Sequence, residues 1–117
     1  YIDSHMSKDL LKQISLPLKT PTTFLVPKSE ELSPLLAGDN ELLAVRLTSN
    51  LLIKFFCEKT DSALISTSAN LNGKKVATTK RELKHYFGNQ LDYALSPSRY
   101  NSEPSRIINL LTGERIR

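Results

Sequence analysis

The sequence contains few residues that could build a covalent or metal-based framework. Cys57 is the only cysteine among 117 residues, which excludes an intrachain disulfide and fits a reducing, cytoplasmic setting. It lies beside two phenylalanines, and we expect a buried structural thiol. His5 and His85 have no cysteine or carboxylate cluster at ligand spacing, so no protein-bound metal is predicted. His85 is expected to be an ordinary surface histidine.

Long apolar runs and common nucleotide-binding signatures are also absent. No uninterrupted apolar run approaches membrane-spanning length, and the first residues are polar, so neither a transmembrane helix nor a signal peptide is indicated. The sequence has no GxGxxG and no GxxxxGK[ST] motif, which excludes the standard dinucleotide and P-loop sites. We therefore expect no association with a membrane.

The composition is that of an ordinary globular domain with a mild basic excess. Hydrophobic residues make up 39% and charged residues 24% of the chain, enough for one domain with a modest core. The formal net charge is +4 and the isoelectric point is about 9.3. This excess permits an anionic partner such as a nucleotide or RNA, without requiring one.

Apolar residues recur with helical and strand periods in alternating segments, which predicts an α/β fold. Strand 42–47, helix 50–59 and strand 63–66 should form a βαβ unit with a right-handed crossover and parallel strands. A polar loop is expected at 96–103. The other expected elements are helices 3–15 (ended by Pro17) and 79–87, a short helix opening near Ser29, strands 20–27, 91–95 and 106–110, and an edge segment at 115–117.

Local signals mark the ends and faces of the two later helices. Thr79 and Glu82 match a capping box, and Gly88 is a natural stop. Thr48 or Ser49 is expected to cap the helix at 50–59. The expected buried face of that earlier helix consists of Leu51, Leu52, Phe55 and Phe56.

Three hydroxyls and an amide are concentrated in the segment Ser66-Thr67-Ser68-Ala69-Asn70, directly after an apolar run. At the carboxyl end of a strand in an open α/β sheet, such a loop lines the crevice where ligands bind. Serine and threonine hydroxyls can hold phosphate or carboxylate oxygens, and loop amides add donors. The alternative is a turn whose side chains cap only their own backbone.

Arg46 is the charged residue of an otherwise apolar strand, which is expected to be buried on both faces. A guanidinium in such a place needs a partner. It can form a bidentate pair with the carboxylate or phosphate of a ligand. It can also form an internal salt bridge, for example with Glu41 or Asp61, and the residues alone leave both interpretations open.

A basic cluster surrounds the hydroxyl segment and the helix expected after it. Most such runs are only a solvated face, and contact with RNA or another polyanion is the alternative. The possible RNA-binding residues of this basic cluster are Lys74, Lys75, Lys80, Arg81 and Lys84.

Four ordered segments resemble signatures of the YrdC family. Residues 66–73 resemble its STSANxSG signature, and residues 43–46 resemble its LAVR strand. Residues 21–27 resemble its PxTFVxP strand, and residues 104–113 resemble its PSTIVDLTG ending. Within the family the likeness is closest to the bacterial threonylcarbamoyl-AMP synthases, and it covers nearly the whole chain.

The resemblance implies an α/β domain with a twisted, mixed, largely parallel sheet and flanking helices. Residues 1–117 would form this single domain. The family's N-terminal segment carries a Lys-x-Arg motif of the nucleotide and substrate site, and we find no counterpart here. We therefore expect a domain that lacks its N-terminal portion, as a fragment, a truncated form or one half of a split gene.

The activity implied by the resemblance condenses L-threonine, bicarbonate and ATP into threonylcarbamoyl-AMP and pyrophosphate, for the t6A modification of tRNA. Magnesium would accompany ATP, and other proteins of the t6A pathway would be partners. No catalytic residue is assigned, because the reaction would depend on positioning and electrostatics. Carried over by position, Arg46 and Ser66 would bind threonine, and Ser68, Asn70 and Ser105 would bind ATP.

Two other functions are compatible with the sequence. The chain could be a non-catalytic module that binds tRNA or double-stranded RNA through the basic cluster. It could also be a sibling paralogue that uses the fold for another carbamoylation.

Overall fold

The computed structural model describes residues 2, 5–16, 18, 20–95 and 104–117. The chain divides into two compact units, residues 1–64 with 104–117 and residues 65–103. We describe each unit by itself. Parts of the expected first helix (residues 3–4), its terminator Pro17 and the expected polar loop 96–103 lie outside the described residues.

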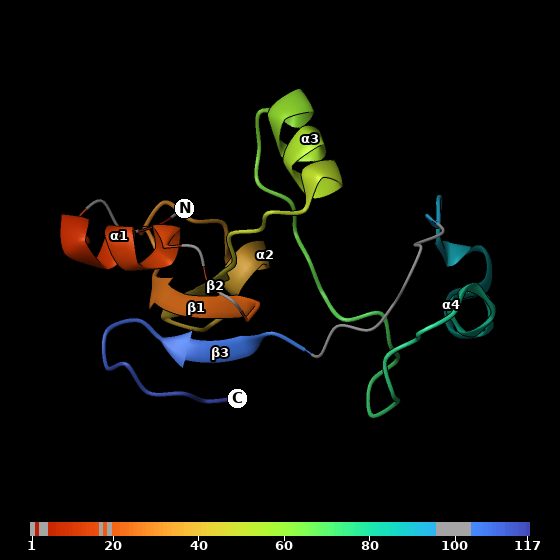
Figure 1. Cartoon of the computed structure of the whole chain (residues 1–117). Helices are drawn as coiled ribbons and strands as arrows, with labels where there is room; N and C mark the ends of the chain where they lie inside the picture. Colours follow the sequence, from red (N-terminus) through yellow and green to blue (C-terminus); the bar gives the residue numbers. More distant parts are fainter. Residues whose placement is uncertain (1, 3–4, 17, 19, 96–103) are drawn as a thin grey trace. The chain divides into compact units, whose positions relative to one another are not determined.

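Among the described residues, the first unit contains a sheet and three helices, and the second contains a helix followed by a short 3-10 turn (Figure 1). The elements in chain order are α1 (Lys8–Ser15), β1 (Thr22–Pro27), α2 (Pro34–Ala37), β2 (Leu42–Val45), α3 (Leu51–Thr60), α4 (Lys80–Phe87), η1 (Gly88–Gln90) and β3 (Arg106–Asn109).

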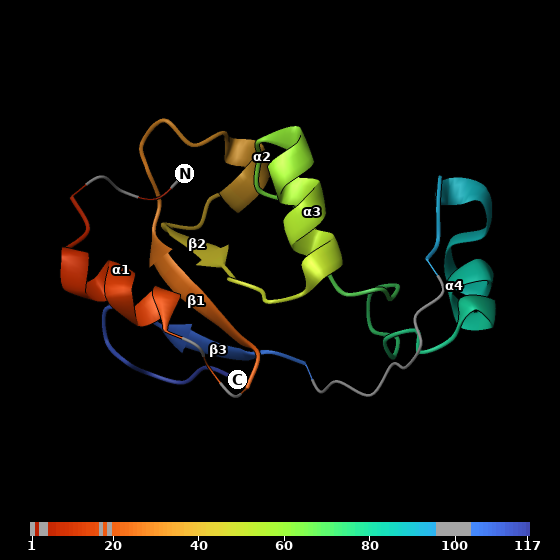
Figure 2. The same cartoon turned by 45° about the horizontal axis from the view of Figure 1, so that its top comes forward.

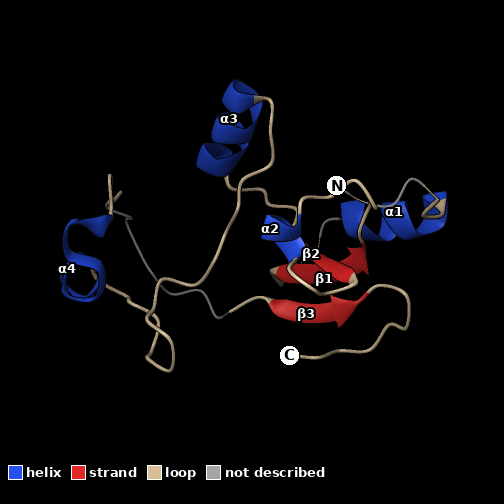
Figure 3. Ribbon diagram, turned by 180° about the vertical axis from the view of Figure 1, so that it is seen from behind, coloured by secondary structure: helices blue, strands red, loops and turns tan. Residues whose placement is uncertain are grey.

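Within the part of the chain that the structure describes, the sheet has three strands in the order β2-β1-β3, so that β1 is central (Figure 2). β1 pairs antiparallel with β2, where Phe24 is the partner of Val45, and parallel with β3, where Phe24 is the partner of Ile108. Helices and strands alternate from α1 to α3, and α4 and η1 then precede β3. Figure 3 shows helices beside the strands of the sheet. The predicted α/β class, with a mixed and partly parallel sheet flanked by helices, is confirmed.

The core of the first unit lies on one face of this sheet. Side chains alternate along a strand, and Thr22, Phe24 and Val26 of β1 are buried while the residues between them are half-buried. Ile14 of α1 and Leu110 complete the buried cluster. α1 therefore packs on this core face, as Figures 1 and 2 show.

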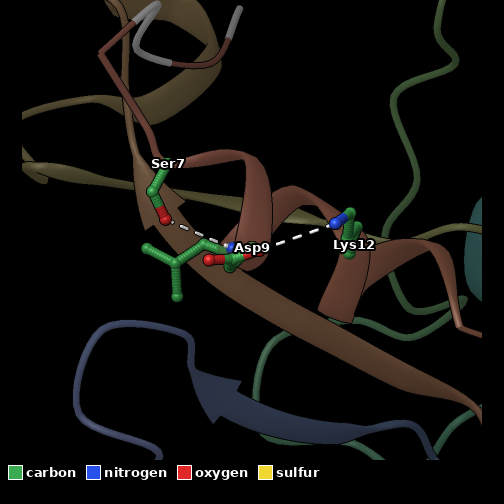
Figure 4. A network of polar contacts seen from close by, with 4 residues as sticks. Ser7, Asp9 and Lys12 are labelled. Atoms are coloured by element: carbon green, nitrogen blue, oxygen red, sulfur yellow. Dashed lines mark hydrogen bonds and ion pairs between the residues drawn. The ribbon is translucent and has the colours of Figure 1, made fainter.

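α1 is amphipathic and begins at a serine cap. The Ser7 Oγ atom accepts a hydrogen bond from the backbone N–H of Leu10 at 3.3 Å, which satisfies one donor of the first turn (Figure 4). Asp9 and Lys12 form an exposed ion pair of 3.7 Å within the helix (Figure 4). Because both groups are largely solvated, this pair contributes little to stability.

The expected βαβ unit is wrong. β2 pairs antiparallel with β1, and residues 63–66 and 91–95 form no strand within the described chain. The apolar run before the hydroxyl segment has strand propensity, but a strand also needs a neighbour with free backbone groups. Because residues 63–66 form no strand, α3 does not connect two neighbouring parallel strands.

α3 differs from expectation in its cap and in its burial. Asn50, rather than Thr48 or Ser49, is the cap, and its Oδ1 accepts from the second and third residues of the helix. The hydroxyl of Thr48 accepts from the N–H of Asn50 at 3.2 Å. Cys57 is half-buried. The side chains expected to be buried are exposed to 80% (Leu51), 42% (Leu52), 50% (Phe55) and 40% (Phe56).

α4 begins and ends where its sequence signals predict, whereas α2 begins later than expected. In the second unit the predicted capping box of Thr79 and Glu82 is confirmed, and the N–H of Gly88 closes α4 by donating to the Lys84 carbonyl. Gly88 has φ of 53°, a conformation that favours glycine. The short helix expected near Ser29 begins later, at Pro34.

Candidate functional site

The face of the sheet opposite the core carries a hydroxyl pair, and we call it the open face. The Oγ1 atom of Thr23 and the Oγ atom of Ser105 are 2.9 Å apart and partly buried, so one hydroxyl donates to the other. This bond joins β1 to the residue just before β3. Ser105, for which the family resemblance implies contact with ATP, is thereby held against the central strand.

The chain end also supports Ser105. The guanidinium of Arg117 donates from Nε and Nη2 to the Ser105 carbonyl, at 3.3 Å in each case. Ile116 N–H donates to the Ile107 carbonyl at 2.8 Å, and Arg115 bridges Ile108. The expected edge segment at the end of the chain is thus confirmed, and it fixes the backbone that carries the Ser105 hydroxyl.

Arg46 directly follows β2 and is exposed. The expectation of a strand buried on both faces is wrong, because β2 is an edge strand whose side chains are at most half-buried. In the described part of the chain Arg46 makes no ion pair with Glu41 or Asp61. The internal salt bridge is therefore not formed, and the guanidinium is open to an anionic ligand.

The hydroxyl segment in the second unit is organised by Asn70. The Asn70 amide donates from Nδ2 to the carbonyls of Leu71 at 3.1 Å and Lys74 at 3.0 Å. Its Oδ1 atom is buried and has no partner among the described residues. Ser66 and Ser68 are exposed, and their hydroxyls make no hydrogen bond in the described chain. The Asn70 amide therefore caps the backbone of its own segment, whereas the hydroxyls of Ser66 and Ser68 are open to a ligand.

The basic cluster also lies in the second unit, and all five of its side chains are exposed. None of them forms an ion pair with a residue that the structure describes. Lys80 and Lys84 are four residues apart in α4 and share one side of the helix. His85, as expected, is exposed.

A groove of about 390 Å³ lies on the core side of the sheet, next to the end of α1. Its lining is equally divided between apolar side chains, among them Leu16, Phe24 and Leu110, and polar or charged ones, among them Gln13 and Arg106. No residue that the sequence assigned to threonine, ATP or RNA lines it. Over the described ranges, there is no cluster of three or more potential metal ligands and no helix long and apolar enough to cross a membrane.

The predicted site residues are divided between the units. Arg46 and Ser105 belong to the first, whereas Ser66, Ser68 and Asn70 belong to the second. Their common site for threonine and ATP stays a prediction. Sequence reasoning missed two residues that contact Ser105. Strand alternation could have indicated Thr23, but no local signal indicated Arg117, which reaches Ser105 only through the path of the chain.

Comparison with known proteins gives relatives that share one name. A protein from Acinetobacter baumannii named threonylcarbamoyl-AMP synthase is 38% identical over 101 residues, covering 86% of this chain and 53% of that protein. One of the same name from Methylobacillus flagellatus is 41% identical over 97 residues (83% and 54%). A third, from Idiomarina loihiensis, is 33% identical over 116 residues (98% and 62%). The chain thus spans somewhat more than half the length of these curated relatives.

A family model matches the whole chain. This model, Sua5/YciO/YrdC, carries the description "Telomere recombination" and matches residues 1–117. The match agrees with the four signature segments and with the mixed sheet whose open face presents the hydroxyl pair. The chain therefore belongs to the Sua5/YciO/YrdC family.

Proposed function

We propose that this chain is part of an L-threonylcarbamoyladenylate synthase, a nucleotidyltransferase that acts in the t6A modification of tRNA. The observation that carries the proposal is the shared name of relatives at 33–41% identity, threonylcarbamoyl-AMP synthase. The substrates would be L-threonine, bicarbonate and ATP with magnesium. The product would pass to other proteins of the t6A pathway, and the setting would be cytoplasmic.

The proposed reaction has two bond-forming steps. Bicarbonate takes up a proton and loses water to form CO2. The neutral threonine amine then attacks the CO2 carbon and releases a proton, which yields a carbamate. A carbamate oxygen then attacks the α-phosphorus of ATP, so that a new P–O bond forms while the bond to the β-phosphate bridging oxygen breaks. Pyrophosphate carries away that electron pair. Because the nucleophile is already anionic, positioning and charge stabilisation would supply most of the rate.

The proposed roles are those that the family resemblance implies, and the chemistry of each side chain is compatible with them. The exposed guanidinium of Arg46 would form a bidentate pair with the threonine carboxylate, and Ser66 would contact threonine. Ser68 and Ser105 would donate to ATP oxygens. Asn70 would lie at the ATP through its unpaired Oδ1, an acceptor suited to an N–H or O–H donor.

Arg46→Ala tests this assignment in protein that contains the chain. Loss of a bidentate, charge-assisted pair should lower kcat/KM for threonine by at least tenfold. The measurement is pyrophosphate release that depends on threonine and bicarbonate, with the adenylate identified by mass spectrometry. Arg115→Ala, in the edge segment, is a control for the loss of one positive charge. An unchanged rate in Arg46→Ala would refute the site, and no threonine-dependent release in the unaltered protein would refute the function.

A second candidate function is the binding of tRNA or double-stranded RNA without chemistry. The observation in its favour is that the five basic side chains of the second unit are exposed and form no ion pair within the described residues. Unpaired lysine and arginine side chains can neutralise phosphates and release counterions. This function predicts a salt dependence that the synthase activity does not require.

A further inference from the structure

We propose that Thr23 is a positioning residue of the substrate site, whose hydroxyl fixes the hydroxyl of Ser105 for contact with ATP, beside Arg46. This inference rests on the proposed function and adds to its site a residue that lies on the central strand. Three features of the first unit support it: the face on which Thr23 lies, the register of the sheet and the hydroxyl pair.

The first feature is the alternation of β1. Its buried side chains, Thr22, Phe24 and Val26, belong to the core face that α1 covers. Successive side chains of a strand point to opposite faces, so Thr23 belongs to the open face and is half-buried there. Its hydroxyl is therefore available to the side of the sheet that α1 leaves uncovered.

The second feature is the register between β1 and β2. Val45, the last residue of β2, is the partner of Phe24 in an antiparallel ladder, and one further step in the same register would oppose Arg46 to Thr23. Side chains of such directly opposed residues lie roughly 5 Å apart at Cβ. The exposed guanidinium, which has no ion-pair partner in the described chain, thus begins next to the Thr23 side chain.

The third feature is the hydroxyl pair on the other side of β1. Thr23 and Ser105 are 82 positions apart in sequence, yet their hydroxyl oxygens are separated by 2.9 Å. A hydroxyl can donate and accept at once. If Thr23 donates, Ser105 keeps its own proton for an anionic phosphate oxygen. The two hydrogen bonds that Arg117 donates to the Ser105 carbonyl fix the backbone of the same residue.

Together these features place one hydroxyl between a cation suited to a carboxylate and a hydroxyl suited to a phosphate. A reaction between threonine carbamate and ATP needs both substrates side by side, and the strands β2 and β3, on either side of β1, would provide fixed positions for them. Thr23 would not touch the reacting atoms. Its contribution would be to restrict the Ser105 hydroxyl to the orientation that donates to ATP.

The test compares Thr23→Val, which keeps the shape but removes the hydroxyl, with Thr23→Ser, which retains it. We expect the KM for ATP in pyrophosphate release to rise three- to tenfold in Thr23→Val, the range of one net hydrogen bond, with kcat changed less than twofold. Thr23→Ser should restore the KM. In the Ser105→Ala background, Thr23→Val should have no further effect, because both changes remove the same interaction.

The matched control is Thr22→Val, on the same strand but the other face, where the removed hydroxyl donates to the Thr20 carbonyl at 2.9 Å. It should leave the KM for ATP within twofold, and urea unfolding should show that all variants fold. An active protein whose KM for ATP is unchanged in Thr23→Val would overturn this inference and leave the proposed function intact. Fully additive effects of Thr23→Val and Ser105→Ala would also overturn it. A protein that binds neither ATP nor threonine by calorimetry would overturn the function and the inference together.

Discussion

The Glu82 side chain accepts hydrogen bonds from several donors at the start of α4. Its Oε2 atom accepts from the backbone N–H groups of Thr78 at 2.7 Å and Thr79 at 3.0 Å, and from their hydroxyls at 3.0 and 3.2 Å. These bonds, first of all the one from the Thr78 backbone, hold the pKa of Glu82 below its ordinary value of 4.5. The charged form is favoured because every partner is a donor.

The lowered pKa predicts a specific pH dependence for α4. A carboxyl whose pKa falls on folding stabilises the fold fully above its unfolded pKa, and this contribution disappears as the pH falls through the lower folded pKa. Thr78→Ala should raise the pKa of Glu82, since a hydroxyl donor is removed. A carbon-13 NMR titration of the carboxyl measures it. Thr60→Ala, whose hydroxyl donates to the Phe56 carbonyl in α3, is the control. A pKa that does not rise in Thr78→Ala contradicts the assignment.

At the scale of elements, local signals were sufficient where a segment carries its own boundaries. The capping box and Gly88 predicted α4, and the flanking prolines predicted β1, since these groups act within a few residues. Residues 63–66 have comparable apolar character but no strand partner, which a local pattern cannot supply. The apolar stripe of α3 likewise predicted a helix correctly, but not what would cover it.

The candidate site was predictable only in part, for the same reason. The type of side chain at Arg46 indicated anion binding, whereas Ser105 and the roles of both residues came from the family resemblance alone. The pairing of Ser105 with Thr23 spans 82 positions and depends on the parallel register of β1 and β3. No short motif contains that information, because it arises when distant strands pair.

At the scale of elements, the burial of the central strand β1 leads to a prediction about stability. Val26 is fully buried, with an exposed fraction of 0%, whereas Leu35 of α2 is 96% exposed. Val26→Ala should lower the free energy of unfolding by about 2 kcal/mol, from reduced burial and the cavity left behind. Leu35→Ala, the control, should change it by less than about 0.5 kcal/mol. Urea denaturation measures both, and equal effects would contradict a core centred on β1.

At the scale of the whole molecule, charge is distributed unevenly along the chain. The net charge is +4, and the five basic residues of the cluster, which form no ion pair within the described chain, all belong to the second unit. In the first unit, by contrast, Lys12 of α1 is paired with Asp9. A polyanion would therefore be attracted to residues 65–103 more than to α1, if charge alone governs binding.

RNA binding through the cluster is testable by its salt dependence. Lys80→Gln with Lys84→Gln should weaken binding and reduce the slope of log affinity against log salt by roughly one to two, about 0.7–0.9 for each phosphate that is no longer neutralised. Lys8→Gln with Lys12→Gln removes two lysines at the same spacing from α1 and is the control. Fluorescence anisotropy with a short RNA duplex measures the slope. An affinity that is insensitive to salt would exclude the electrostatic form of this function.

Because β1 has a core face and an open face, the alternation of its side chains between the two faces constrains how the strand can evolve. Substitutions at alternate positions affect either the core or the proposed site, so each face can change while the other is kept. A single-residue insertion or deletion within Thr22–Pro27 has a different effect. It would send Thr23 into the core and a core side chain to the open face, because a slip of one residue exchanges the faces of a strand. The strand can therefore accept gradual substitution, but its length cannot vary by one.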